Sequence, residues 1–332
     1  MTKKRLLMLV LFAMPGASYA WGPDGHHTVA AIAANLIAGS NAAAQVKALL
    51  GDVTLVDAAV WADCAKGVNS TTLQYQGAGH FPECTVFETP DGEAGMVDFV
   101  SRNATNCVIK PGEEICHKQY HYSDVAVQHM AYQIGFVGTR NDDIVAAVVA
   151  TIHVLKGDPA PPPFNIKDKA EAMRLLAHYA GDIHQPLHVG AMYLDAQGNE
   201  VNPHTGTFDP TTATRGANSI MVLPGGRKNL HATWDAIPAS LKMTHVNSTW
   251  LSAARAVPAT TGADFDWPKQ WASDSVVEAN QALSGLAFGP FASGHWTVRL
   301  PSGYSTSMRS IKKRQLTRAG ARLAQLLQDI FP

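Results

Sequence analysis

One stretch, AHYAGDIHQPLH from Ala177 to His188, restricts the possible architecture of this chain more than any other. His178 and Asp182 are four residues apart, so on a helix they share one face and are separated by roughly 6 Å along the axis. This spacing lets an imidazole and a carboxylate reach one metal ion or two adjacent ions. Pro186 cannot continue the helix, and a break before it would return His188 to the same side. Taken alone, the spacing also fits a helix with ordinary core or solvated histidines.

The rest of the sequence favours helices over strands. Alanine is abundant, alternating β-branched runs are few, and apolar residues recur at spacings of three and four, the period of an amphipathic helix. The pattern predicts an all-α, single-domain fold with long loops at 67–120 and 190–228. Helices are expected over residues 26–38, 41–50, 53–66, 123–135, 141–156, 167–184, 229–244, 249–256, 268–287 and 310–330.

The first 20 residues are typical of a secretory signal peptide. Positive residues at 3–5 precede an apolar run at 6–14, and Ser18-Tyr19-Ala20 fits a cleavage site. We therefore expect cleavage between Ala20 and Trp21 and an exported protein, either periplasmic or secreted. The apolar run is shorter than the roughly 20 residues that a membrane span needs, and no later stretch qualifies, so no contact with a membrane is expected.

The net charge argues against a general nucleic-acid-binding surface. Removal of residues 1–20 leaves 23 of the 26 Lys and Arg against 27 Asp and Glu, a net charge of −4. Attraction for phosphate must then be local or supplied by bound metal.

Four cysteines lie within 53 residues, at Cys64, Cys84, Cys107 and Cys116. In an exported chain an even number of cysteines indicates disulfides, here two bonds with three possible pairings. A zinc site is the alternative, but the spacings contain no C-x2-C pair. Of the three pairings we favour the nested one, Cys64–Cys116 with Cys84–Cys107, which would close the 67–120 loop.

Several of the fourteen histidines stand near carboxylates. His231 and Asp235 repeat the four-residue spacing of the first pair, and cleavage before Trp21 would free an amino group that can chelate a metal ion with its own carbonyl oxygen. Nitrogen and oxygen donors of these types favour zinc over magnesium or calcium. The candidate ligands are five imidazoles, three carboxylates and the new amino terminus, namely Trp21, His26, Asp63, His121, His178, Asp182, His188, His231 and Asp235.

The order of these motifs resembles that of the zinc-dependent single-strand nucleases, the nuclease I type of plants, fungi and bacteria. Bacterial zinc phospholipases C are distant relatives of that family. The resemblance spans residues 21–332 and implies a mainly helical domain with three zinc ions in a cleft. It rests on W-G-x-x-G-H at Trp21–His26, W-A-D at Trp61–Asp63, H-aromatic-x-D at His121–Asp124, H-x-x-G-D-x-x-Q-P-L-H at His178–His188, R-G-x-N at Arg215–Asn218 and N-L-H-x-x-W-D at Asn229–Asp235.

The resemblance also divides the ligands among three zinc ions. The first zinc would be held by Asp63, His121, His178 and Asp182, and the second by His188, His231 and Asp235. The third would be held by the Trp21 amino nitrogen and carbonyl oxygen, His26 and the shared carboxylate of Asp182.

His80 is an alternative to His121, because it too precedes an aromatic residue. The aspartate of the motif is missing after His80, whereas Asp124 follows His121 at the expected place. We therefore favour His121, which makes 67–120 an insertion that carries the disulfides.

The resemblance implies hydrolysis of P–O3′ bonds of single-stranded RNA and DNA to 5′-phosphates, together with 3′-nucleotidase activity. A hydroxide held by the zinc cluster would attack phosphorus in line. Asp124 would orient or deprotonate this water. Lys66 stands where relatives often carry arginine, and it would meet a phosphate as a point charge without the bidentate fork.

Two further residues are candidates for substrate binding. Tyr122, at the aromatic position of the family motif, would stack on a base, although a tyrosine buried beneath the metals is an equal alternative. Asn218 of the R-G-x-N motif is the second candidate. Nucleic acid and nucleotides are thus the expected partners, and we expect a monomer.

Two other functions fit part of the pattern. A zinc-dependent phospholipase C would use the same cluster, but that group tends to carry glutamate where this chain has Asp235. A non-catalytic zinc-binding or zinc-storing protein would bind metal without turnover, and it gives no reason for Asp124 beside the ligands.

Overall fold

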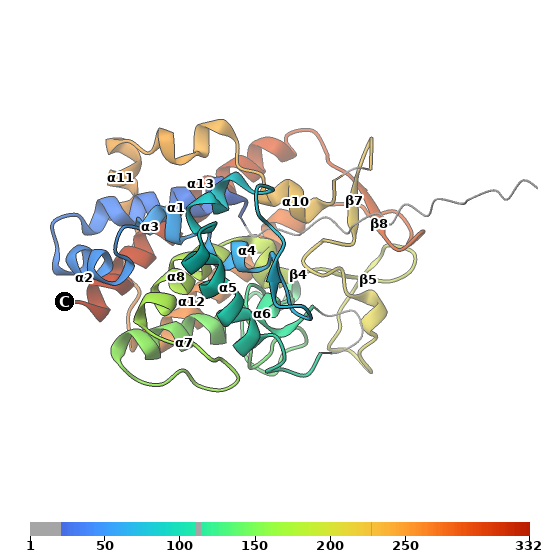
Figure 1. Cartoon of the computed structure of the whole chain (residues 1–332). Helices are drawn as coiled ribbons and strands as arrows, with labels where there is room; N and C mark the ends of the chain where they lie inside the picture. The colour runs from blue at the N-terminus through green and yellow to red at the C-terminus, as the bar shows by residue number, and fades with distance from the viewer. Residues whose placement is uncertain (1–20, 110–113, 227) are drawn as a thin grey trace, which may run out of the picture.

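The computed structural model describes residues 21–109, 114–226 and 228–332, and the chain is mainly helical, as predicted (Figure 1). The predicted signal peptide lies outside the described residues. The α-helices are α1 (Pro23–Ile37), α2 (Asn41–Leu50), α3 (Leu55–Ala58), α4 (Trp61–Ala65), α5 (Pro90–Asn103), α6 (Cys116–Gln119), α7 (Ile144–Lys156), α8 (Lys169–Asp182), α9 (Pro186–Val189), α10 (Leu230–Asp235), α11 (Ser248–Arg255), α12 (Trp267–Leu283) and α13 (Tyr304–Ile330). The 3-10 helices are η1 (Pro82–Phe87), η2 (Val127–His129), η3 (Pro210–Thr212), η4 (Ala239–Leu241), η5 (Met243–His245) and η6 (Asp264–Asp266).

The strands are short and join in pairs. Within the described residues, β1 (Val68–Asn69) and β2 (Gln74–Tyr75) are antiparallel, as are β5 (Tyr193–Leu194) and β6 (Glu200–Val201), while β3 (Val125–Ala126) with β4 (Gly190–Ala191) and β7 (Ile220–Leu223) with β8 (Trp296–Arg299) are parallel. In Figure 1, β5, β7 and β8 lie at the right-hand end, opposite α2 and the C terminus. None of the helices described combines the length and apolar character that a membrane span requires.

α8 is the central helix of the core. It contacts α1, α2, α3, α4, α7 and α13. Asp168 caps its first turn by accepting a hydrogen bond from the Glu171 amide, and every residue from Leu175 to Asp182 is buried. Because neighbours surround the last two turns of α8, the side chains of its C-terminal end have fixed positions.

The predicted break before Pro186 is present. α8 ends at Asp182, and α9 begins with Pro186 as its first residue, where the missing amide is not needed. The Gln185 side chain caps α9 by accepting from the Leu187 amide at 2.6 Å. The turn between the two helices brings His188 back toward the side of α8 that carries Asp182, and His188 Nδ1 lies 3.9 Å from Asp182 Oδ1.

The helix predicted over 53–66 is interrupted. α3 ends at Ala58 and α4 begins at Trp61, and the Ala59 carbonyl between them accepts a hydrogen bond from His178 Nδ1 at 2.7 Å. In a continuous helix that carbonyl would face the amide four residues later. The break thus provides an acceptor for a histidine of α8.

The prediction of a helix over 123–135 is wrong. The Ser123 amide donates to the His188 carbonyl at 2.7 Å, and Val125 pairs with Gly190 in the parallel bridge of β3 and β4. These contacts join segments far apart in the sequence, and they override the local apolar pattern. The helix predicted over 229–244 is also too long, because α10 stops at Asp235, ahead of Pro238.

The 67–120 segment is more ordered than the predicted loop, since it contains β1, β2, η1, α5 and α6. The nested disulfide pairing is wrong. The bonds join Cys64 to Cys84 and Cys107 to Cys116. α4 packs against η1, which brings Cys64 beside Cys84, and the 14 residues of α5 then separate this pair from the other two cysteines.

Candidate metal centre

Two candidate ligands project from the end of α8. His178 Nε2 lies 3.0 Å from Asp182 Oδ2, and both side chains are fully buried. His178 Nδ1 donates to the Ala59 carbonyl, so its Nε2 carries the lone pair and faces the carboxylate. A histidine held in this tautomer by a backbone carbonyl is typical of metal ligands.

Asp63 of α4 and His121, in the turn after α6, converge on the same carboxylate. His121 Nδ1 lies 2.9 Å from Asp182 Oδ2 and 3.0 Å from His178 Nε2. Asp63 Oδ1 is 3.6 Å from His178 Nε2 and 3.9 Å from His121 Nδ1. We call Asp63, His121, His178 and Asp182 the Asp182 group.

His26 reaches the Asp182 group from the first turn of α1. Its ring stacks on the His178 ring at a centroid separation of 3.9 Å, and its Nε2 lies 3.3 Å from Asp182 Oδ1. A Cβ on Gly181 would lie 2.6 Å from His26 Nδ1, so the glycine of the long motif permits this approach. The two oxygens of Asp182 therefore face different histidines.

Trp21 is buried beside these residues. A Cβ on Gly25 would lie 2.6 Å from the Trp21 Cβ, so the glycine lets the chain fold back over the first turn of α1. The Gly22 amide donates to the Asp235 carbonyl at 3.0 Å. The segment that follows the predicted cleavage site is thus bonded to α10.

His188 of α9 and two residues of α10 form a second cluster, which we call the Asp235 group (His188, His231 and Asp235). His188 Nδ1 donates to the His121 carbonyl, and His231 Nδ1 donates to the Gly216 carbonyl, each at 2.7 Å. Both Nε2 lone pairs then face each other at 3.1 Å, with Asp235 Oδ2 3.5 Å from His231 Nε2. Two lone pairs so close repel each other unless a cation lies beside them.

The buried environment favours the neutral form of four of the five candidate imidazoles. Burial lowers the pKa of His26 to about 4 and that of His231 to about 3, and it also lowers the pKa values of His121 and His188. Burial acts in the same direction on His178, but the charges of Asp182 and Asp63 outweigh it and raise its pKa. Neutral imidazoles are the form that binds metal.

The pKa values of the two carboxylates Asp182 and Asp235 are shifted in opposite directions. Burial favours the protonated form of Asp182, but His178 and His188 outweigh it and hold its pKa well below the usual range. Burial raises the pKa of Asp235 well above its usual range. Asp63 Oδ2 and Asp182 Oδ1 are buried and accept no hydrogen bond from the described residues. The Asp182 group thus has oxygen atoms that a cation would satisfy.

In the described part of the chain, three sets of residues each bring their own donor atoms within 4.8 Å of one another. They are His26, Asp63 and His178; His121, His178 and Asp182; and His188, His231 and Asp235. All members are buried, and the first two sets share His178. Nitrogen and carboxylate donors in threes and fours fit zinc, so the chemistry of the three sets is consistent with a three-zinc centre.

Comparison with known proteins agrees with this chemistry. The family model described as S1/P1 Nuclease matches residues 21–332. The chain belongs to the S1/P1 nuclease family. It is similar to Endonuclease 4 of Arabidopsis thaliana, with 26% identity over 98% of this chain and 93% of the plant protein. It is also similar to Endonuclease 5 of that plant, with 24% identity over 98% and 95% of the two chains.

The protein is therefore a nuclease of the S1/P1 type. Lys66 contacts the Asp182 group from its rim. The Lys66 ammonium is 2.7 Å from Asp63 Oδ1, and its side chain is 14% exposed. Burial would lower the pKa of Lys66, but Asp63 and Asp182 outweigh this effect and raise it. A protonated lysine thus lies at the rim of the Asp182 group.

Asp124 and Tyr122 follow His121 closely in the sequence, and their backbone groups bond to other segments of the chain. The Asp124 amide donates to the Gly138 carbonyl at 3.1 Å, and its carbonyl accepts from the Tyr193 hydroxyl at 2.7 Å. The Tyr122 carbonyl accepts from the Ile144 amide, and both Tyr122 and Asp124 are half-buried. The three donor sets contain neither residue.

Asn218 supports the loop that carries Gly216. Its side-chain amide donates to the Arg215 carbonyl at 3.0 Å, and its oxygen accepts from Asn229 at 3.2 Å. Asn229 caps α10, so Asn218 links the R-G-x-N loop to the Asp235 group.

The remaining histidines of interest lie outside the three sets. His80 is exposed, whereas His121 is buried in the Asp182 group. His184 Nδ1 bonds to the Ala180 carbonyl, and its Nε2 lies 3.1 Å from Arg322 of α13.

Sequence reasoning gave no role to three motif residues that the structure places in the centre. Gln185 donates to Asp235 Oδ1 at 2.8 Å while it caps α9. Gly216 has a φ of +56°, and a Cβ there would lie 2.2 Å from the Leu187 carbonyl oxygen, so only glycine can bring this backbone to His231. Gly181 accommodates the His26 ring. These residues could have been found from the sequence, because all three belong to the motifs on which the family resemblance rests.

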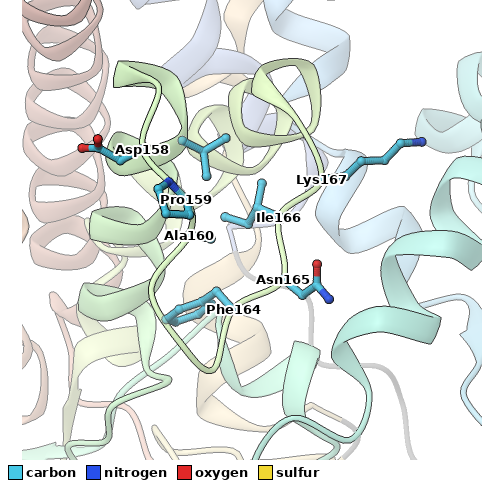
Figure 2. A pocket seen from close by; sticks show the side chains of 8 residues that line it. Asp158, Pro159, Ala160, Phe164, Asn165, Ile166 and Lys167 are labelled. Carbon is cyan, nitrogen blue, oxygen red and sulfur yellow. The ribbon is translucent and has the colours of Figure 1, made fainter.

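A separate cavity of about 340 Å³ lies between α7 and α8. Figure 2 shows the charged ends of Asp158 and Lys167 pointing away from each other on opposite sides of it, with Phe164 and Ile166 between them. None of the candidate ligands lines this cavity, and its polar groups do not converge.

Proposed function

We propose that the protein is an exported zinc-dependent nuclease that hydrolyses P–O3′ bonds of single-stranded RNA and DNA to 5′-phosphates, and that it also removes 3′-phosphates from nucleotides. The observation that carries the proposal is the position of Asp182. Its Oδ1 lies 3.3 Å from His26, and its Oδ2 lies within 3.0 Å of His121 and His178. A carboxylate with ligands on both sides is suited to bridge two zinc ions.

The ligand sets are those that the family resemblance implies. The Asp182 group would hold one zinc, the Asp235 group a second, and the amino nitrogen and carbonyl oxygen of Trp21 with His26 and Asp182 a third. Bound zinc would supply a water of lowered pKa and positive charge beside the phosphate oxygens.

The protein's own groups would position the substrate and move the proton. Asp124, half-buried and three residues after His121, would orient the attacking water and accept its proton. Lys66, at the rim, would exchange part of its contact with Asp63 for a phosphate oxygen. Phosphorus would then lie between the Asp124 carboxylate, which accepts the proton, and the Lys66 ammonium.

Single-strand selectivity follows from the burial of the ligands. A base must leave the helical stack before its phosphate can reach side chains that are almost inaccessible to solvent. Tyr122 would stack on the displaced base, which contributes about 1–3 kcal/mol regardless of its identity. Asn218 would contact the base from the opposite loop.

Export and maturation belong to the same proposal. The family match begins at Trp21, the buried position of Trp21 suits an amino-terminal ligand, and two disulfides are consistent with an oxidising compartment. We infer cleavage after Ala20, a single domain over residues 21–332 with 67–120 as an insertion, and a monomer.

The proposal is tested by counting zinc and measuring activity on protein that begins at Trp21. We expect three zinc ions per chain and cleavage of single-stranded DNA that a chelator abolishes. Asp182→Asn should remove at least two ions and the activity, whereas Asp158→Asn, a change at an exposed carboxylate, should alter neither. Release of phosphocholine from phospholipid vesicles without DNA cleavage would identify a phospholipase, and metal without turnover would identify a zinc-binding protein.

A further inference from the structure

Lys312 of α13 is a buried lysine whose partners are carbonyls at the end of α10. Its side chain is 1% exposed, and its ammonium donates to the Thr233 carbonyl at 2.9 Å and to the Ala236 carbonyl at 2.7 Å. The ammonium also lies 5.7 Å from the ring centroid of Trp234. Among the described side chains, no carboxylate forms an ion pair with it.

A buried ammonium without a carboxylate partner is costly unless its hydrogen bonds are satisfied. The last carbonyls of a helix have no partners within the helix and carry the negative end of its dipole, so they suit a cation. Burial lowers the pKa of Lys312 to about 8, so it remains mostly protonated at neutral pH. The charge of Lys312 therefore acts on α10.

α10 cannot hold its own ligands in place. It has six residues, with His231 in its first turn and Asp235 at its end, and so short a helix is unstable by itself. Its C-terminal carbonyls are held from two distant parts of the chain, because Gly22 donates to Asp235 while Lys312 donates to the residues on either side of Trp234 and Asp235.

We propose that Lys312 is a positioning residue for the Asp235 group: its hydrogen bonds to the Thr233 and Ala236 carbonyls fix the last turn of α10 and thereby the position of Asp235. The inference rests on the proposal that this group binds zinc. It concerns metal affinity, so it is measured without substrate.

The test compares Lys312→Met with Arg314→Met in protein that begins at Trp21. Arg314 lies on the same helix but pairs with Glu278 of α12, so its replacement removes an equal charge away from the metal centre. Zinc is counted during competition with a chelator. We expect Lys312→Met to weaken one of the three ions by about ten- to a hundred-fold and to leave the others unchanged, as for other groups that support metal ligands. Arg314→Met should retain all three.

A double variant identifies the affected ion. Once His231→Ala has removed the zinc of the Asp235 group, Lys312→Met should have no further effect on the remaining two ions. Unchanged affinity for all three ions in Lys312→Met, or equal weakening of all three, would overturn the proposal. If Lys312→Met does not fold, Lys312→Gln replaces it, because glutamine retains a neutral donor, and a smaller loss confined to the same ion is required.

The zinc counts separate this inference from the proposed function. Wild-type protein that binds three ions but cleaves no nucleic acid would refute the nuclease mechanism. The role of Lys312 would still be tested by the zinc affinities of Lys312→Met, which either show the selective weakening of one ion or do not. Wild-type protein without zinc would overturn both.

Discussion

The Asp182 group and the Asp235 group use the same residue types on supports of different size. His178 and Asp182 stand on α8, a helix of 14 residues that six other helices surround. His188, His231 and Asp235 stand on α9 and α10, which have 4 and 6 residues. Packing in the core fixes the positions of His178 and Asp182, whereas individual hydrogen bonds fix those of the Asp235 group.

Those hydrogen bonds come from every side of the Asp235 group. Gln185 holds Asp235, the Gly216 carbonyl holds His231, and the His121 carbonyl holds His188. Two ligand groups of the same chemistry can therefore differ in how well they tolerate substitutions of the residues that support them. Changes to supporting residues should affect the Asp235 group selectively, and changes to α8 should affect the whole centre.

The largest expected effect is the loss of Asp182, whose two oxygens face different histidines and which we propose to be shared by two zinc ions. We expect Asp182→Ala to lose two zinc ions and His231→Ala to lose one. Activity on single-stranded DNA should fall by roughly a thousand-fold or more in Asp182→Ala, since a metal contributes several kcal/mol of charge stabilisation. Zinc analysis and initial rates measure both. Equal zinc loss in the two variants would contradict the difference between the groups.

Gln185→Ala should weaken the zinc of the Asp235 group by about ten- to a hundred-fold, because it removes the donor to Asp235 and the cap of α9 together. Gln325→Ala is the matched control, since Gln325 makes two comparable hydrogen bonds to Thr260, outside the metal centre. Zinc competition measures the change. The idea fails if both variants bind zinc with the same affinity.

Removal of metal from the unmodified protein should follow the same order. In a chelator titration we expect the ion of the Asp235 group to leave first, at about one tenth of the chelator concentration that empties the Asp182 group, a difference of about 1.4 kcal/mol. Zinc counting along the titration shows the steps, and His231→Ala should lack the first one. Release of all ions in one step would show that the two supports are equally rigid.

The smallest effect separates folding stability from metal binding. Asp168 caps α8 and Asn229 caps α10, each by accepting one backbone hydrogen bond. Replacement of either residue by alanine should lower the free energy of unfolding by about 1 kcal/mol. Only Asn229→Ala should also weaken zinc binding, because the cap of α8 lies three turns from its ligands. Thermal unfolding with and without zinc distinguishes the two.

Local geometry made much of the Asp182 group predictable. The spacing of His178 and Asp182 requires only helical periodicity, and the structure places their ligand atoms 3.0 Å apart. The break before Pro186 is likewise a property of one residue and its neighbours. Ligands far apart in sequence, such as His26 and Asp235, could be assembled only through the order of the motifs.

Tertiary contacts explain what the sequence did not predict. The 123–135 segment has apolar spacing but is drawn into the bridge of β3 and β4 by contacts with residues about 65 positions away. α5 begins with Thr89 and Pro90, a recognisable start signal, but Gly92 and Gly95 weaken its helical pattern. The disulfide pairing depended on α5, because only its length separates the two bonds.

The interruption between α3 and α4 has a consequence for engineering. A variant that joined the two helices through residues 58–61 would gain local hydrogen bonds and would score as an improvement in a screen for heat resistance. The same variant would take the Ala59 carbonyl away from His178 and free its ring to adopt the other tautomer. Selection for robustness in this segment would therefore select against catalysis, and any thermostable version of this enzyme should leave the interruption intact.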